Sequence, residues 1–80
     1  MADRIACFGV AVQNRRKELK LNQVELADKA KLSPSYVSRV ERGLTPPALD
    51  TICALADALR TRPSTLVLEM ERLTRPPGKR

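Results

Sequence analysis

The chain has 80 residues, of which 42% are apolar, which suffices for one modest hydrophobic core but not for two. Fifteen Lys or Arg residues against nine Asp or Glu give a formal net charge of +6, which favours a partner of dense negative charge. Because the chain has no His and its two cysteines, Cys7 and Cys53, are isolated, an enzyme, a metal site and a cofactor are not expected.

The sequence contains no membrane or export signal. No apolar run approaches the ~20 residues that a membrane-spanning helix needs. Asp3 precedes Arg4 at the start and no extended apolar segment follows, unlike a signal peptide. We expect a cytoplasmic protein whose two cysteines are small residues of the core or its boundary, and no membrane partner.

The first predicted helix covers residues 5–20. Its apolar residues are spaced three, four and seven apart along one helical stripe: Ile5, Phe8, Val12 and Leu19. The second half of this helix carries four basic residues: Arg15, Arg16, Lys17 and Lys20. On their own they indicate the solvated side of an amphipathic helix.

A second helix is predicted to start at Gln23. Asn22 and Glu25 have the spacing of a capping box, in which each side chain bonds the backbone N–H of the other residue. The helix carries Val24, Leu26, Ala27 and Ala30 and is short, because the next start signal follows closely.

The third predicted helix covers residues 34–42. Ser33 is its candidate N-cap, and Pro34 suits the first helical position, where a missing N–H costs little. Gly43 can adopt the left-handed conformation that closes a helix. The residues expected in the core are Val37 and Val40.

Two further helices complete an all-α, compact five-helix fold. Pro46 and Pro47 stiffen a loop before a helix over residues 48–59, and Pro63 opens a helix that extends to residue 73. The apolar face of the fourth helix is predicted to contain Leu49, Ile52, Cys53, Leu55, Ala56 and Leu59. We predict one domain over residues 1–73 and a basic, disordered tail over residues 74–80.

Two short helices joined by a tight turn allow the second helix to enter a DNA major groove. Four segments carry a resemblance: residues 23–27 (QVELA), 32–43 (LSPSYVSRVERG), 47–52 (PALDTI) and 55–59 (LADAL). At these separations they resemble the Cro/repressor-type (XRE-like) helix-turn-helix family. The resemblance implies a lambda-repressor-like fold and a sequence-specific transcriptional regulator that binds double-stranded DNA, with no small-molecule ligand. The family includes small phage Cro-like repressors and the controller proteins of restriction-modification systems, and this chain resembles both kinds.

The resemblance also assigns site residues. It places base-reading positions at Pro34, Ser35, Ser38 and Arg39. Contacts to the DNA backbone are expected from Gln23, Lys31, Ser33, Tyr36 and Arg42. The Arg39 guanidinium can donate twice to guanine, whereas Pro34 offers only apolar contact. Other interpretations stay open: Lys31 as a solvated lysine, Ser33 chiefly as a cap, Tyr36 as a shield of the turn, and Arg42 as helix-end electrostatics.

Three structural features follow from the same resemblance. Arg16 and Glu41 match an ion pair that ties the first helix to the third. Lys31 and Arg60 replace glycines, so both are expected to be left-handed and strained.

Apolar residues on the fifth helix leave surface for a partner, and the resemblance implies a homodimer that binds a pseudo-palindromic operator. The predicted interface comprises Leu66, Val67, Leu68 and Met70. An alternative function is an antitoxin-type protein-interaction module that binds a partner protein first and DNA secondarily.

Overall fold

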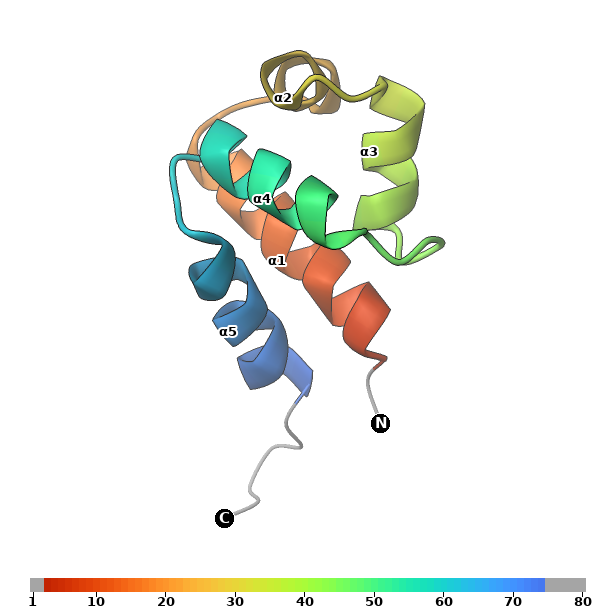
Figure 1. Cartoon of the computed structure of the whole chain (residues 1–80), viewed down its shortest axis with the longest axis vertical. Coiled ribbons are helices and arrows are strands. Elements are labelled where there is room, and N and C mark those ends of the chain that lie inside the picture. Colours follow the sequence, from red (N-terminus) through yellow and green to blue (C-terminus); the bar gives the residue numbers. More distant parts are fainter. Residues whose placement is uncertain (1–2, 75–80) are drawn as a thin grey trace.

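Five helices and no strand make up residues 3–74, the part of the chain that the computed structural model describes. The helices are α1 (Arg4–Glu18), α2 (Gln23–Ala30), α3 (Pro34–Glu41), α4 (Leu49–Ala58) and α5 (Pro63–Thr74). In Figure 1, α1 packs against both α3 and α5, while α2 packs against α3 and α4. The predicted all-α fold is confirmed.

The starts of α2 and α3 are set by side-chain caps, as predicted. The Glu25 N–H donates to Asn22 Oδ1 at 2.7 Å, and the Asn22 N–H donates to Glu25 Oε1 at 2.9 Å, which completes the capping box of α2. Ser33 Oγ accepts the N–H of Tyr36 at 3.1 Å at the start of α3. An additional cap at Asp3, which accepts the N–H of Ile5, starts α1 one residue earlier than predicted.

Three of the turns place a basic residue in the left-handed region. Lys31 and Arg60, expected there, have φ values of 60° and 58°. Lys20 also has φ 59°, and α1 correspondingly ends at Glu18 rather than at residue 20. Gly43 closes α3 with φ 72°. A side chain at Gly43 would also approach Ala6 Cα within 2.8 Å.

One buried cluster forms the core between the helices. Its largest fully buried side chains are Phe8, Val12, Leu26, Val37, Val40, Leu55 and Leu59. The predicted inner face of α4 is partly wrong, because Leu49 is 73% exposed and Cys53 is exposed. These two residues are four positions apart and share a line along α4 that faces solvent. Cys7 is buried.

Gly9 permits a close contact between α1 and α3. A Cβ atom at this position would lie 2.4 Å from the Val40 carbonyl oxygen and 2.5 Å from that of Glu41. Both distances are far below van der Waals contact and involve backbone atoms. The absence of a side chain at Gly9 therefore sets how closely α3 can approach the rest of the fold.

At the C-terminal end, α5 includes one residue that was assigned to the tail. Thr74 is helical, and its hydroxyl donates to the Met70 carbonyl oxygen at 2.7 Å. The remainder of the predicted tail, residues 75–80, lies outside the described residues. Among the helices of residues 3–74, none combines the length and apolarity needed to cross a bilayer.

Candidate nucleic-acid interface

α3 has one face inside the protein and one face in solvent. Val37, Val40 and Glu41 are buried. The predicted DNA-contacting residues on and beside the helix that are exposed are Lys31, Ser33, Pro34, Ser35, Arg39 and Arg42, while Tyr36 and Ser38 are half-buried. Figure 1 shows α3 at the edge of the molecule. The outward face of this helix is therefore accessible to a large partner.

Polar contacts organise this outward face. Arg39 Nη1 donates to Ser35 Oγ at 3.1 Å, and the Arg39 guanidinium carbon lies over the Tyr36 ring, 5.6 Å from its centroid. The Tyr36 hydroxyl lies 3.5 Å from Thr51 Oγ1 on α4, at the outer limit of a hydrogen bond. Ser35, Tyr36 and Arg39 thus form one contiguous group, called here the Arg39 cluster.

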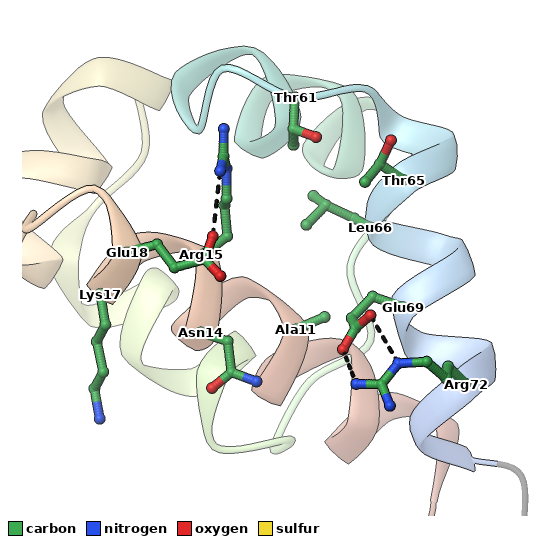
Figure 2. Close-up of a pocket in the computed structure, with 10 residues that line it drawn as sticks. All are labelled: Ala11, Asn14, Arg15, Lys17, Glu18, Thr61, Thr65, Leu66, Glu69 and Arg72. Atoms are coloured by element: carbon green, nitrogen blue, oxygen red, sulfur yellow. Dashed lines mark hydrogen bonds and ion pairs between the residues drawn. The ribbon is translucent and has the colours of Figure 1, made fainter.

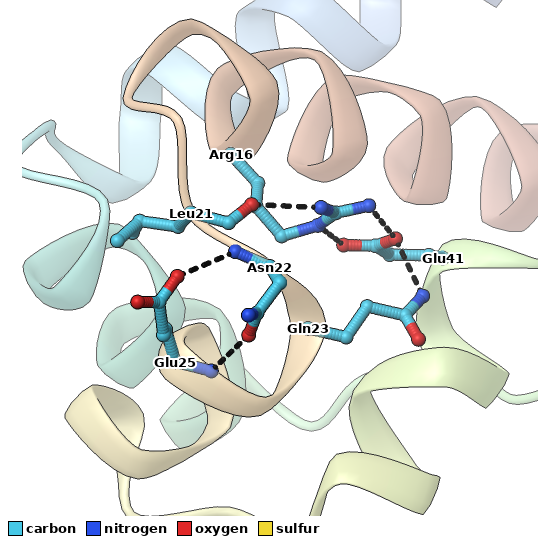
Figure 3. Close-up of polar contacts among 6 residues, drawn as sticks. All are labelled: Arg16, Leu21, Asn22, Gln23, Glu25 and Glu41. Atoms are coloured by element: carbon cyan, nitrogen blue, oxygen red, sulfur yellow. Dashed lines mark hydrogen bonds and ion pairs between the residues drawn. The ribbon is translucent and has the colours of Figure 1, made fainter.

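A buried ion pair joins α1 to α3 behind this surface. Arg16 Nε donates to Glu41 Oε2 at 2.7 Å and Arg16 Nη2 donates to Glu41 Oε1 at 2.9 Å, a bidentate arrangement (Figure 3). Arg16 Nη1 also donates to the Leu21 carbonyl oxygen at 2.9 Å. The hydrogen bond to Glu41 holds the pKa of Arg16 above its ordinary value, so the guanidinium stays charged.

Gln23 extends this network to the start of α2. Its Nε2 donates to Glu41 Oε1 at 2.9 Å. A carboxylate only accepts, so the bond to Glu41 orients the amide group and uses one of the two hydrogens on Nε2. The network thus fixes the first residue of α2 against the last residue of α3. No pattern in the sequence indicated this contact.

Arg15 has a role that its position in a basic run did not indicate. Its Nε donates to the Leu59 carbonyl oxygen at 3.0 Å and its Nη2 to the Arg60 carbonyl oxygen at 3.1 Å. These carbonyls lie at the C-terminal end of α4, where backbone acceptors lack helical partners. Arg15 therefore ties α1 to the end of α4, and reading it as merely solvated was wrong.

A groove lies between α1 and α5 in the described part of the chain (Figure 2). Its lining includes two pairs within single helices, Arg15 with Glu18 and Arg72 with Glu69. With Lys17, the lining carries three basic and two acidic side chains. The excess of positive charge expected for a nucleic-acid surface is thus not concentrated there, and the exposed face of α3 remains the candidate interface.

The structure separates the four residues predicted for a dimer interface. Leu66 is 3% exposed and belongs to the core, so its assignment to an interface was wrong. Met70 is half-buried and packs against the same core. Val67 and Leu68 remain accessible, with 37% and 64% exposure. α5 needs its inner stripe to cover the core, which leaves only the outer residues for a partner.

Comparisons with known proteins identify the class of protein to which this chain belongs. The helix-turn-helix family model matches residues 12–66, and the chain belongs to this family. It is a DNA-binding module of the kind found in transcriptional regulators.

Individual relatives agree with this class. The chain is 46% identical over 61 residues to the immunity repressor protein of Bacillus phage phi105, which covers 76% of this chain and 42% of the repressor. The chain thus spans less than half the length of that relative. The restriction-modification controller protein C.AhdI from Aeromonas hydrophila superposes with a TM-score of 0.76 at 37% identity, covering 78% of this chain and 94% of the controller.

A third relative was solved with DNA. The P22 c2 repressor in complex with a synthetic operator superposes with a TM-score of 0.69 at 34% identity, covering 74% of this chain and 89% of the repressor chain.

Proposed function

We propose that this protein is a sequence-specific transcriptional regulator that inserts α3 into the major groove of double-stranded DNA. The observation that carries the proposal is that α3 is buried on one side only: Val37 and Val40 lie in the core, whereas Arg39 is exposed. A helix with its side chains matches the ~12 Å width of the groove. The action is binding, with no catalytic step.

Two kinds of contact make up the proposed interface. Base edges are contacted by Pro34, Ser35, Ser38 and Arg39, and the DNA backbone by Gln23, Lys31, Ser33, Tyr36 and Arg42. Arg39 discriminates most, because a guanidinium can donate two parallel hydrogen bonds to guanine. Gln23 contributes its second Nε2 hydrogen to a phosphate, at a helix N-terminus that itself favours anions.

The proposal is tested by selecting bound sequences from a randomised duplex pool with the full chain. A recurring motif is expected. On the selected site, Arg39→Ala lowers affinity by roughly 5- to 150-fold, while affinity for random duplex changes much less. Gln23→Ala weakens both alike. Arg62→Ala, which removes an exposed charge outside the interface, is the matched control. A pool that yields no motif contradicts the proposal.

The regulator acts as a homodimer through the outer side of α5, where Val67 and Leu68 are accessible. Two-fold symmetry places the half-sites roughly 34 Å apart, and the selected motif is then palindromic. Leu68→Glu should convert the dimer to a monomer in sedimentation and weaken operator binding. Val24→Glu, equally exposed on α2, is the control for dimerisation. A wild-type chain that stays monomeric with and without DNA contradicts the dimer.

A further inference from the structure

Arg39 is exposed, yet its side chain contacts two neighbours on α3. Ser35, one helical turn earlier, accepts a hydrogen bond from Arg39 Nη1 at 3.1 Å. The Tyr36 ring lies beneath the guanidinium, with 5.6 Å between the guanidinium carbon and the ring centroid. A solvated arginine on a helix surface ordinarily samples many rotamers. Here two neighbours direct it back toward the N-terminal end of α3.

The platform under Arg39 is itself fixed to the body of the protein. The Tyr36 side chain is half-buried and packs against the core cluster. Its hydroxyl lies 3.5 Å from Thr51 Oγ1 on α4. These contacts restrict the motion of the Tyr36 ring relative to the core. A cation over such a ring gains electrostatic attraction in a defined orientation.

We propose that Ser35 and Tyr36 are positioning residues for Arg39, and that Ser35 influences sequence discrimination through Arg39 rather than by touching a base. This inference rests on the proposed function and deepens it, because it says how the specificity of the site is produced. It replaces the direct base-reading role of Ser35 with an indirect one.

The chemistry of the guanidinium is compatible with this role. Arginine has five N–H donors, and the bond to Ser35 uses one hydrogen of Nη1. Nε and Nη2 still present two parallel N–H groups, the pair that guanine O6 and N7 accept. Because the side chain is ordered before DNA arrives, less rotamer freedom is lost on binding.

The first test concerns the free protein and needs no operator. Nitrogen-15 relaxation of the Arg39 Nε–H group reports its motion on the picosecond-to-nanosecond timescale. The order parameter is expected to fall in Ser35→Ala and in Tyr36→Leu, and to stay near wild type in Tyr36→Phe, which keeps the ring. An equally mobile Arg39 in wild type and in both disruptive variants overturns the proposal.

The second test is a double-mutant cycle on the selected site and on random duplex. Ser35→Ala should lower the ratio of specific to random affinity by roughly 2- to 12-fold when Arg39 is present. In the Arg39→Ala background the same change should alter that ratio less than roughly 2-fold. Ser38→Ala, a serine on the same helix with no bond to Arg39, should give the same ratio change in both backgrounds.

The outcomes distinguish this inference from the proposed function. A motif that depends on Arg39, with equal Ser35→Ala effects in both backgrounds, overturns the positioning role and leaves the regulator intact. A pool with no motif removes the regulator, and the relaxation test then decides alone whether Ser35 and Tyr36 order Arg39. Circular dichroism and thermal unfolding of each variant confirm that the exposed substitutions leave the fold in place.

Discussion

The α1–α3 junction and helix α5 each contain an arginine–glutamate pair, and the two pairs differ in burial. In the junction, the Arg16 and Glu41 side chains are 10% and 1% exposed and come from residues 25 apart in the chain. On α5, the Arg72 and Glu69 side chains are 68% and 34% exposed and are three residues apart. Both arginines have a raised pKa because each donates a hydrogen bond to its glutamate.

The comparison shows that burial, rather than the pairing itself, decides what such a contact contributes. Water competes for Arg72 and Glu69 and screens their attraction, so the pair gains little. Glu41 is almost fully desolvated, and its oxygens bind Arg16 and Gln23 instead of water. Removing one member of the buried group leaves a charge that has no replacement partner. The junction is therefore the sensitive region, although the residue types are the same.

The largest effect is expected for Glu41→Ala. It leaves the Arg16 guanidinium buried without its carboxylate and also frees Gln23, so the free energy of unfolding should fall by about 3 to 5 kcal/mol. Urea unfolding followed by circular dichroism measures this. The double variant Arg16→Met/Glu41→Leu, which replaces both charges with apolar groups, should recover much of the loss. If Glu41→Ala is as stable as wild type, burial does not determine how much the pair contributes to stability.

Gly9→Ala breaks the same junction without touching a charge. Helix propensity alone predicts that the change stabilises α1 by about 1 kcal/mol. The added Cβ, however, meets the carbonyl oxygens of Val40 and Glu41 at 2.4 and 2.5 Å, so α3 has to shift. We expect a net loss of about 1 to 3 kcal/mol in thermal unfolding. Val10→Ala, at the exposed neighbouring position, is the control; stabilisation by Gly9→Ala would show that the junction is loosely packed.

The sequence predicted those features whose cause lies within a few residues. Asn22 with Glu25, and Ser33 with Pro34, mark the starts of α2 and α3 by contacts confined to one helical turn. The apolar spacing of α1 likewise predicted its inner face, including Phe8 and Val12. The five-helix order follows from such local signals, with ends that differ by one or two residues.

Apart from the Arg16–Glu41 pair, which the family resemblance supplied, contacts between distant segments could not be predicted from the sequence. Arg15 binds carbonyl oxygens 44 and 45 residues away, and nothing in a basic run distinguishes it from a solvated arginine. Leu66 and Leu68 are equally apolar in sequence, and only the docking of α5 shows which one is buried. Gln23 was singled out by family resemblance alone, which did not indicate its bond to Glu41.

Lys31→Gly separates the backbone strain at this residue from its surface charge. Unlike the two previous substitutions, it should raise the free energy of unfolding, and by a smaller amount. Lys31 has φ 60°, a conformation that costs a residue with a Cβ atom roughly 1 kcal/mol and costs glycine much less. Thermal unfolding should therefore show stabilisation of up to about 1 kcal/mol. If Lys31 also contacts a phosphate, affinity for specific and random DNA should fall alike, and the slope of log K against log salt should decrease by about 1.

Lys31→Ala is the matched control, because it removes the charge and keeps the strained Cβ. It should lower DNA affinity as much as Lys31→Gly does, without the gain in stability. An unchanged salt slope in both variants would assign Lys31 to solvent and leave the strain as the only consequence of this residue.

The smallest effect is expected for Glu69→Gln on α5. The hydrogen bond from Arg72 lowers the pKa of Glu69, so the pair stabilises the fold above the ordinary carboxyl pKa, and this contribution is lost as pH falls through the lowered value. Near neutral pH the loss should be about a tenth of that caused by Glu41→Ala, because solvent screens the exposed pair. Urea unfolding at pH 7 and pH 3 checks both points: the small difference between Glu69→Gln and wild type should shrink at the lower pH. A difference as large as that of Glu41→Ala would mean that exposure does not weaken the pair, and the contrast between the two regions would fail.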